Sequence, residues 1–356
     1  MSNPIVSVAM VVYNVDRFLA EAIDSILAQS FRDFEFIIVD FGSTDNSKPI
    51  VQNYAAKDSR IRFHEIPHCS LVAARNASCS LAQGEYIAIM DADDVSLANR
   101  IALEVEFMEK HPEVGALGGL TETINAGSEV VPGRIHHPPA DDHEIKTALG
   151  VRCPFCQSSV MIRRKAFELV GGYREAFLQA EDYDLWLRIA EHFQWGCLRQ
   201  VVHRYRVHPY QLSIQRHRQQ ALCVLAARAS ASVRRSGGPD PLDSAKEITP
   251  AMLSDLGVTK SMQESELANN CRNWIRNLCG AGEHSAALEA TLAFLQSDLQ
   301  YVERSRIADF HLVAARLYWL QKRTLRSLLA VGHAVMTRPK VAGRPLKVLL
   351  HRARLI

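Results

Sequence analysis

The sequence has no strong excess of charge of either sign. Its 356 residues include 41 Lys and Arg against 39 Asp and Glu, so the formal net charge is +2. Proteins that bind nucleic acid usually concentrate positive charge to neutralise phosphates. This balance gives no support for that class, and no nucleic-acid partner is expected.

Long apolar runs are also missing. No stretch reaches the roughly 18 residues that a membrane-spanning helix needs. The N-terminal segment MSNPIVSVAMVVYN has no basic residue before its apolar run and no small-residue cleavage pattern. It is therefore interpreted as a first strand and not as a signal peptide. We expect a cytoplasmic protein whose eight cysteines are mostly reduced.

Only one pair of cysteines, Cys153 and Cys156, has the CxxC spacing. A four-cysteine zinc site needs a second pair, which the chain lacks. A thioredoxin-like redox site would stand early in the chain, after a first strand and at the start of a helix. Neither function is expected of this pair.

The first part of the chain alternates apolar strands with amphipathic helices. Helical spacing of apolar residues predicts helices at 16–29, 44–56 and 71–83, and apolar runs predict strands at 5–12, 34–39, 61–66 and 86–90. This rhythm predicts an α/β fold with a mostly parallel sheet. Beyond it we expect a strand at 114–119, a loop at 121–142 rich in Gly, Pro and His, and strands at 158–162 and 201–207.

The composition changes after about residue 215, where the chain becomes Ala-rich and helical. Ser236-Gly237-Gly238-Pro239 is the strongest helix-breaking segment in this part. We predict two domains, 1–215 and an all-α region 216–356, with the boundary within 215–240.

Polar residues gather where the predicted strands end. Asp91, Asp93 and Asp94 follow the apolar run at 86–90, and Tyr13 and Asp40 follow the first two strands. In open α/β sheets, ligands bind at the carboxyl ends of the strands. An acidic cluster can hold a phosphorylated ligand only through a cation, for which Mg²⁺ or Mn²⁺ is suited. The alternative is a surface turn whose acids favour a helix N-terminus.

Several segments in the same order resemble the family-2 glycosyltransferases of bacterial cell-surface polysaccharide synthesis, which have the GT-A nucleotide-sugar-binding fold. The matching segments are VSVAMVVYN (6–14), FEFIIVDFGSTDNS (34–47), AARNASCSLAQGEYIAIMDADD (73–94), SSVMIRRKAFELVGGYREAFLQAEDYDLWLRIA (158–190) and HRYRVHPYQLS (203–213). The resemblance covers about the first 215 residues. It does not extend to the helical region.

The resemblance implies a donor site. Asp91 and Asp93 match the DxD motif that meets the divalent cation and the diphosphate of the sugar nucleotide. Asp40 matches the base and ribose region, Arg75 matches a position near the nucleotide, and Tyr13 stands at the same sheet edge.

The resemblance also implies two residues for the chemistry. Asp182, in the pair Glu181-Asp182, matches the catalytic base, although an acid here could simply cap a helix. His208 matches a position that approaches the diphosphate or the metal, although it could equally be a surface histidine before Pro209.

One position departs from the family. A second acid usually follows the residue that corresponds to Asp40, and here it is Phe41. A phenyl ring cannot accept the N–H of a nucleobase, although it can stack on one. The usual uridine contact is therefore in doubt.

The implied function is an inverting transfer of a sugar from a nucleotide-sugar, with a UDP-sugar as the expected donor. The acceptor would be a saccharide or a lipid-linked saccharide in polysaccharide or glycolipid synthesis. The alternative is a non-catalytic GT-A-fold subunit or scaffold of an assembly complex, which Phe41 would favour. A nucleotidyltransferase is disfavoured, because VVYNVDRF after the first strand is not a Gly-rich, basic loop.

The C-terminal tail from 322 to 356 has nine Lys and Arg and no acid, with leucines and valines between them. A basic amphipathic helix can bind an anionic membrane surface. We expect either peripheral contact of this tail with the inner face of the plasma membrane or a solvated helix that packs on the catalytic domain.

Overall fold

The computed structural model describes residues 3–211 and 216–341. The chain divides into two compact units. The first consists of residues 1–124, 128–206 and 230–247, and the second of residues 125–127, 207–229 and 248–356. The domain boundary expected within 215–240 stays a prediction.

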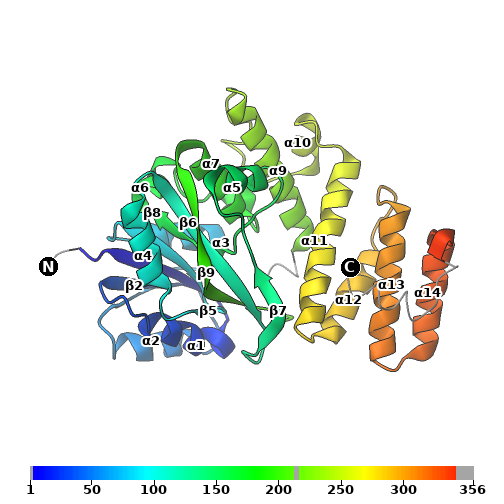
Figure 1. Cartoon of the computed structure of the whole chain (residues 1–356), viewed down its shortest axis with the longest axis horizontal. Helices are drawn as coiled ribbons and strands as arrows, with labels where there is room; N and C mark the ends of the chain where they lie inside the picture. The colour runs from blue at the N-terminus through cyan, green and yellow to red at the C-terminus, as the bar shows by residue number, and fades with distance from the viewer. Residues whose placement is uncertain (1–2, 212–215, 342–356) are drawn as a thin grey trace. The chain divides into compact units, whose positions relative to one another are not determined.

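Four parallel strands form one half of the sheet in the first unit (Figure 1). They are β1 (Val6–Val12), β2 (Phe34–Asp40), β3 (Ile61–Glu65) and β4 (Tyr86–Asp91), in the order β3-β2-β1-β4. Every residue of β1 and β2 is buried, as expected of strands covered on both faces. Val12 pairs with Asp40 and Val11 with Asp91, so the ends of β1, β2 and β4 meet at one edge.

The other half of the sheet mixes strand directions. β8 (Met161–Arg163) joins β4 to β6 (Val114–Ile124) by antiparallel pairs, and β6 is parallel to β9 (Gln194–Arg206). β5 (Val95–Ser96) pairs with β9, and β7 (Val130–His136) with β6. Most of the paired length is parallel, as predicted.

The prediction of a loop at 121–142 is wrong. β6 continues to Ile124, and β7 returns along it, with Ile124 opposite Val130 and Thr121 opposite His136. β7 is largely exposed and contains Pro132 and Gly133. An edge strand tolerates proline because one side of it makes no ladder hydrogen bonds, and its exposure removes the apolar pattern that would have revealed it.

Helices cover the sheet and supply much of the core. They are α1 (Asp16–Leu27), α2 (Ser47–Ala55), α3 (Leu71–Ser80), α4 (Arg100–Lys110), α5 (Asp142–Leu149), α6 (Arg164–Leu169) and α7 (Glu181–His192). The apolar face of α1, with Leu19, Ile23 and Ile26, is fully buried in the same cluster as β1 and β2. The Ser70 hydroxyl accepts the Ala73 N–H and begins α3 at Leu71.

The described part of the second unit is helical, as predicted. α9 (His217–Arg235) runs through both units, and it is followed by α10 (Pro250–Asp255), α11 (Lys260–Gly280), α12 (His284–Leu295), α13 (Arg304–Leu320) and α14 (Thr324–Thr337) (Figure 1). Phe294 stacks on Phe310 with ring centroids 4.0 Å apart, which joins α12 to α13. Among the described helices, none combines the length and the apolarity that a membrane span requires.

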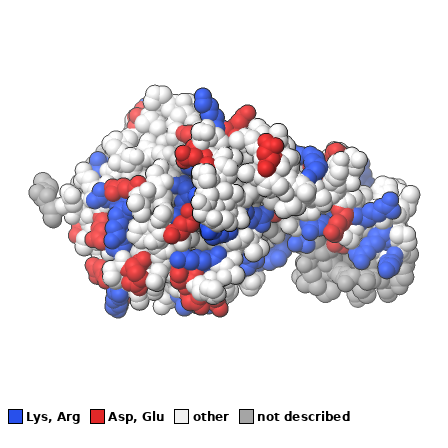
Figure 2. Space-filling model, turned by 90° about the horizontal axis from the view of Figure 1, so that it is seen from above, with Lys and Arg blue, Asp and Glu red and all other residues white. Residues whose placement is uncertain are grey.

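The last described helix leaves apolar side chains exposed. α14 contacts α13 through a stripe of small buried residues, Ser327, Ala330 and Ala334, while Leu325, Leu328, Leu329 and Met336 lie in solvent. Membrane contact through the basic tail stays a prediction, and residues 342–356 lie outside the described residues. Acidic and basic side chains are interspersed on the left part of the face in Figure 2, in keeping with the small net charge.

Asp240 fastens the segment 230–247 to the rest of the first unit. Its carboxylate accepts hydrogen bonds from Arg174 Nη1 at 2.8 Å, from Arg234 Nη1 at 2.5 Å and from the Ser230 hydroxyl at 2.5 Å. Arg174 also pairs with the buried Asp184 of α7. Burial raises the pKa of Asp240, but the Ser230 hydroxyl, the backbone and the arginines outweigh it and bring the pKa to about 2.

We expect Asp240→Asn to lower the free energy of unfolding by about 1–2 kcal/mol at pH 7. The pKa of Asp240 is depressed in the fold from an ordinary 3.8. Its ionised contribution is therefore fully present above about pH 4 and is lost as the pH falls toward 2. Urea unfolding at pH 7 and pH 3 measures both effects. The exposed Asp243→Asn is the matched control, and an equal loss in the two variants at pH 7 would contradict the prediction.

Candidate active site

Asp91, the last residue of β4, is held on both carboxylate oxygens. Arg75 Nη2 lies 3.0 Å from Oδ1, and the Ser158 hydroxyl donates to Oδ2 at 2.7 Å. Ser158 Oγ also accepts the Asp91 N–H at 3.1 Å. Burial alone would raise the pKa of Asp91, but the Arg75 charge and the Ser158 hydrogen bond outweigh it and lower the pKa. Asp91 is therefore an ionised, fixed carboxylate.

Arg75, on α3, joins the end of β4 to the start of α7. Its Nε lies 3.1 Å from Glu181 Oε1, and its side chain is only 11% exposed. Burial lowers the pKa of this guanidinium, but the charges of Asp91 and Glu181 more than compensate and raise it. The guanidinium is a permanent cation between two acids that would otherwise repel each other.

Asp182 lies beside this bridge in the first turn of α7, where the Tyr183 N–H donates to its Oδ1 at 2.7 Å. Burial raises the pKa of Asp182 to about 7, and the charge of Glu181 adds to the effect, although the Tyr183 N–H and Arg75 oppose it. A carboxyl with a pKa near neutrality can take up and release a proton under working conditions.

The loop after β4 is anchored by β9. Arg206 donates from Nε to the Asp93 carbonyl at 2.6 Å and from its backbone N–H to Asp94 Oδ1 at 2.8 Å. His203 Nε2 lies 2.9 Å from Asp94 Oδ2. Arg206 is itself fixed by Glu21 at 2.7 Å. Backbone and side-chain contacts therefore set the path of residues 91–94.

Asp94 and His203 form a buried pair. Burial raises the pKa of Asp94 well above its ordinary value, and the charges of Asp93 and Asp91 add to the effect. Burial and the Arg100 charge lower the pKa of His203 to about 3. The imidazole is therefore neutral at neutral pH.

Asp40 is the last residue of β2, and its two carboxyl oxygens differ in their hydrogen bonding. Oδ1 accepts the N–H groups of Gly42 and Ser43, each at 2.9 Å. Oδ2 is buried and has no hydrogen-bond partner among the described residues. A buried carboxyl oxygen left in this way carries a desolvation cost, which a donor group of a ligand would offset.

Three rings gather beside Asp40. Tyr13 stacks on Phe41 with centroids 5.0 Å apart and 24° between the planes, and lies 5.1 Å from His68. Tyr13 is 38% exposed and Phe41 only 5%. His68 Nδ1 lies 3.2 Å from the Phe41 carbonyl. Phe41 therefore stacks behind Tyr13, and Tyr13 and His68 are the exposed rings.

Of the residues predicted from sequence, the structure brings Arg75 and Asp91 into contact, and Arg75 carries charge that acts on Asp182. Tyr13 and Asp40 lie at the neighbouring strand ends. His208 lies two residues beyond β9, in the second compact unit, and is buried. Its role as a metal ligand stays a prediction.

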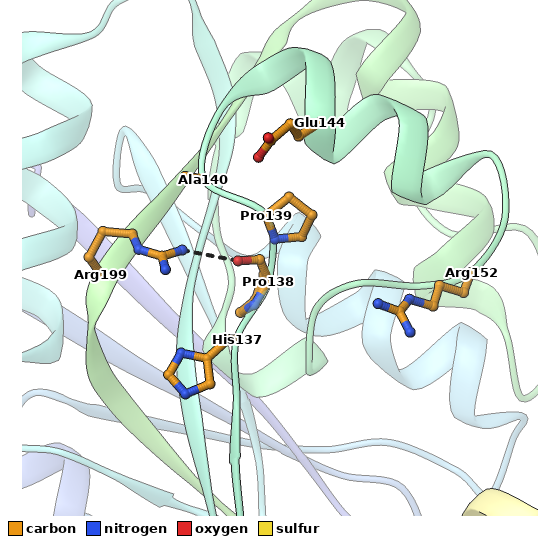
Figure 3. Close-up of a pocket in the computed structure, with 7 residues that line it drawn as sticks. All are labelled: His137, Pro138, Pro139, Ala140, Glu144, Arg152 and Arg199. Atoms are coloured by element: carbon orange, nitrogen blue, oxygen red, sulfur yellow. Dashed lines mark hydrogen bonds between the residues drawn. The ribbon is translucent and has the colours of Figure 1, made fainter.

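An open pocket of about 360 Å³ lies in the first unit (Figure 3). It is lined by His137, Pro138, Pro139, Ala140, Glu144, Arg152 and Arg199. Arg199 donates to the Pro138 carbonyl at 3.0 Å. None of the predicted site residues lines it, but Arg152 begins the segment that leads past Cys153 to Ser158.

Sequence reasoning did not assign roles to Ser158, His203, Arg206 or His68. Ser158 and His203 reach Asp91 and Asp94 from 67 and 109 residues away in the chain. The available signal was weak: Ser158 precedes a short apolar run, and His203 and Arg206 lie in a strand of mixed polarity. Their partners follow only from the pairing of β8 and β9 with the rest of the sheet.

Comparison with known proteins places the chain in a family. The sequence model described as Glycosyl transferase family 2 matches residues 7–171. EpsE of Bacillus subtilis (strain 168), named as a glycosyltransferase, is 38% identical over 194 residues, which cover 53% of this chain and 68% of EpsE. The O-antigen biosynthesis glycosyltransferase WbnJ of Escherichia coli is 29% identical over 207 residues, or 57% of this chain and 80% of WbnJ.

Solved structures share the fold at low sequence identity. S. aureus TarS 1-349 in complex with UDP-GlcNAc superposes with a TM-score of 0.53 at 14% identity, covering 95% of this chain and 92% of that chain. The mannosyltransferase PcManGT from Pyrobaculum calidifontis, in complex with GDP-Man and Mn²⁺, gives 0.51 at 20% identity, covering 95% and 88%.

The protein is thus a glycosyltransferase, and the predicted GT-A fold is confirmed. The chain belongs to glycosyl transferase family 2.

Proposed function

We propose that this enzyme transfers a sugar from a nucleotide-sugar to an acceptor hydroxyl with inversion at the anomeric carbon. The observation that carries the proposal is Asp182, a carboxyl with a pKa near 7 beside the fixed Arg75–Asp91 pair. The expected donor is a UDP-sugar, and the acceptor a saccharide or lipid-linked saccharide of cell-surface polysaccharide or glycolipid synthesis. The names of EpsE and WbnJ support glycosyl transfer, and that of WbnJ supports this biosynthetic setting.

The donor would bind across the ends of β1, β2 and β4. Asp40 Oδ2 offers an acceptor to a nucleobase or ribose donor group, and the exposed face of Tyr13 offers a stacking surface. TarS in complex with UDP-GlcNAc and PcManGT in complex with GDP-Man share this fold, which supports a nucleotide-sugar as the donor.

Residues of the DxD loop suit a hard divalent cation. Both Asp91 oxygens are engaged by Arg75 and Ser158, which suits Asp91 to contact with the cation through its water shell. Asp93, the second acid of the DxD motif, is the other candidate ligand. His208 is a further candidate ligand. Mg²⁺ or Mn²⁺, when bound, would neutralise charge on the departing diphosphate. The Mn²⁺ named with PcManGT supports this role.

Asp182 would act on the acceptor. As its carboxylate accepts the proton of the acceptor hydroxyl, the oxygen attacks the anomeric carbon from the side opposite the diphosphate. A new C–O bond forms, and the bond from that carbon to the phosphate oxygen breaks, which inverts the configuration. A positioned base contributes typically about 10²–10⁴-fold.

A non-catalytic subunit is the competing proposal. It gains support from Phe41, which replaces the second acid of the family. Against it stands the retained site: Arg75, Asp91 and Glu181 form a charge bridge, and Asp182 beside it has a pKa raised to about 7, a costly arrangement that a scaffold would not need.

Asp182→Asn should reduce kcat at least about 100-fold and leave the donor dissociation constant within about threefold, because a base acts in the chemical step. Wild-type kcat should rise with pH up to about 7 and then level off, since the carboxylate is the active form. Transfer assays from pH 5 to 9 with a panel of nucleotide-sugars measure both, with the exposed Glu168→Gln as control. Activity within tenfold of wild type would remove Asp182 from this role.

The same variant should be more stable at alkaline pH. A carboxyl whose pKa rises from 3.8 to about 7 on folding destabilises the fold progressively from pH 4 to 7 and fully above it. Asp182→Asn should therefore gain about 1–2 kcal/mol at pH 8, and much less at pH 4.

Donor binding should need a divalent cation. Calorimetric titration with UDP should show at least about tenfold tighter binding with Mn²⁺ than with chelator, and Asp93→Asn should lose most of that difference. Asp33→Asn, an exposed carboxylate before β2, is the control. Equal affinity of the wild type with and without metal would contradict the prediction.

Phe41 should reduce the discrimination of the donor site between nucleobases. Stacking on Tyr13 is open to every base, whereas a buried hydrogen-bonding acid rejects mismatches. UDP should therefore compete only modestly better than GDP or ADP, and Phe41→Asp should sharpen the preference for UDP by roughly 1–3 kcal/mol. Tyr13→Ala should weaken the binding of UDP, GDP and ADP to a similar extent. If the wild type already rejects purine nucleotides a thousandfold, other residues read the base.

A further inference from the structure

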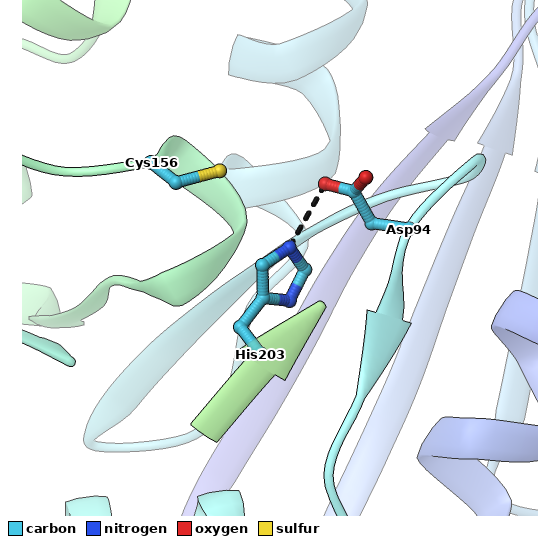
Figure 4. A group of neighbouring side chains, drawn as sticks. All are labelled: Asp94, Cys156 and His203. Atoms are coloured by element: carbon cyan, nitrogen blue, oxygen red, sulfur yellow. Dashed lines mark hydrogen bonds and ion pairs between the residues drawn. The ribbon is translucent and has the colours of Figure 1, made fainter. Parts of the chain in front are cut away.

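Asp94, Cys156 and His203 converge from three parts of the first unit (Figure 4). Asp94 follows β4, Cys156 precedes the turn at Gln157–Ser159, and His203 lies in β9. One ligand atom from each lies within 4.8 Å of the other two. Asp94 and His203 are buried, and Cys156 is half-buried.

The hydrogen bonds of this group orient its two buried members. Asp94 uses Oδ1 for the Arg206 N–H at 2.8 Å and Oδ2 for His203 Nε2 at 2.9 Å. His203 Nε2 is the ring nitrogen on the side of Asp94 and Cys156 in Figure 4, whereas Nδ1 lies on the opposite side of the ring. A cation in this group would therefore bind Nε2 and take the place of the proton between that nitrogen and Asp94.

The chemistry of the group differs from that of the DxD motif. A thiolate, an imidazole and a carboxylate form the ligand set of Zn²⁺ and similar borderline-soft ions, whereas Mg²⁺ and Mn²⁺ prefer oxygen alone. Bond lengths of about 2.0–2.3 Å place tetrahedral ligand atoms about 3.3–3.8 Å apart. His203 Nε2 and Asp94 Oδ2 lie 2.9 Å apart, and all three ligand atoms lie within 4.8 Å of one another, so they are close enough to approach that spacing around one ion.

We propose that Asp94, Cys156 and His203 form a second cation site, selective for Zn²⁺ over Mg²⁺ and Mn²⁺ and separate from the cation of the donor. Three protein ligands leave a fourth position for water. The bound ion joins the loop after β4 to β9 and to the segment before Ser158, the residue that holds Asp91. Zn²⁺ therefore fixes the elements on which the donor-binding aspartates stand.

Cobalt(II) is the probe for the test, because it reports a thiolate ligand by a near-ultraviolet charge-transfer band and tetrahedral geometry by its visible bands. The full-length chain, stripped of metal by a chelator and kept reduced, is titrated with Co²⁺. One equivalent should bind with both signals in the wild type. Cys156→Ser should lose the charge-transfer band and weaken binding at least tenfold, and Cys153→Ser should keep both.

The site must also be distinct from the donor cation. Excess Mg²⁺ and UDP should leave the cobalt spectrum unchanged, while one equivalent of Zn²⁺ should abolish it. Zn²⁺ should raise the Tm of the wild type and of Cys153→Ser but not that of Cys156→Ser. His203→Gln tests the imidazole, and its thermal unfolding shows whether the variant folds.

Absence of a thiolate band in the wild type, its survival in Cys156→Ser, or its displacement by Mg²⁺ would each overturn the proposal. None of these readouts depends on sugar transfer. Failure of this site therefore leaves the proposed transferase untouched, and failure of transfer leaves this site untouched.

Discussion

The ion-pair bridge of Arg75 with Asp91 and Glu181 is the interaction on which the site depends. Asp91, Asp93, Asp94, Glu181 and Asp182 are gathered at one sheet edge, and such a cluster opposes its own folding by repulsion. One buried guanidinium, at 3.0 Å from Asp91 and 3.1 Å from Glu181, offsets part of that repulsion. Because α3 carries the arginine, the same contact fixes the end of β4 against the start of α7.

This bridge also explains why two neighbouring acids of α7 differ. Glu181 is directly paired with Arg75, whereas the Asp182 carboxylate accepts the Tyr183 N–H and has no ion pair among the described residues. Burial and the charge of Glu181 therefore act on Asp182 with little compensation and raise its pKa to about 7. A proton acceptor needs a carboxylate whose charged form is disfavoured, because such a group binds a proton readily near neutral pH. The fold therefore loses free energy of unfolding at the residue for which the chemistry is proposed.

The strands that build this edge could be predicted from the sequence alone. The side-chain contacts that hold its aspartates could not. β1, β2 and β4 are continuous apolar runs, and parallel strands of this kind place their carboxyl ends together, so Asp40 and Asp91 were predicted at one edge. β7 was mistaken for a loop because an exposed edge strand with Pro132 has no apolar pattern. Ser158 and His203 were missed because their partners lie 67 and 109 residues away, a distance that no local pattern spans.

The aspartates at the end of β4 are held by different partners, and this reduces their mutual repulsion. Asp91 is ionised against Arg75 and Ser158, and Asp94 turns inward to His203 and the Arg206 backbone, where burial raises its pKa. The Arg206 side chain also fixes the backbone between them, because its Nε donates to the Asp93 carbonyl at 2.6 Å. The loop is therefore anchored at each of its three aspartates, and this rigid path delivers the DxD motif to the sheet edge where a phosphate-bound cation would lie.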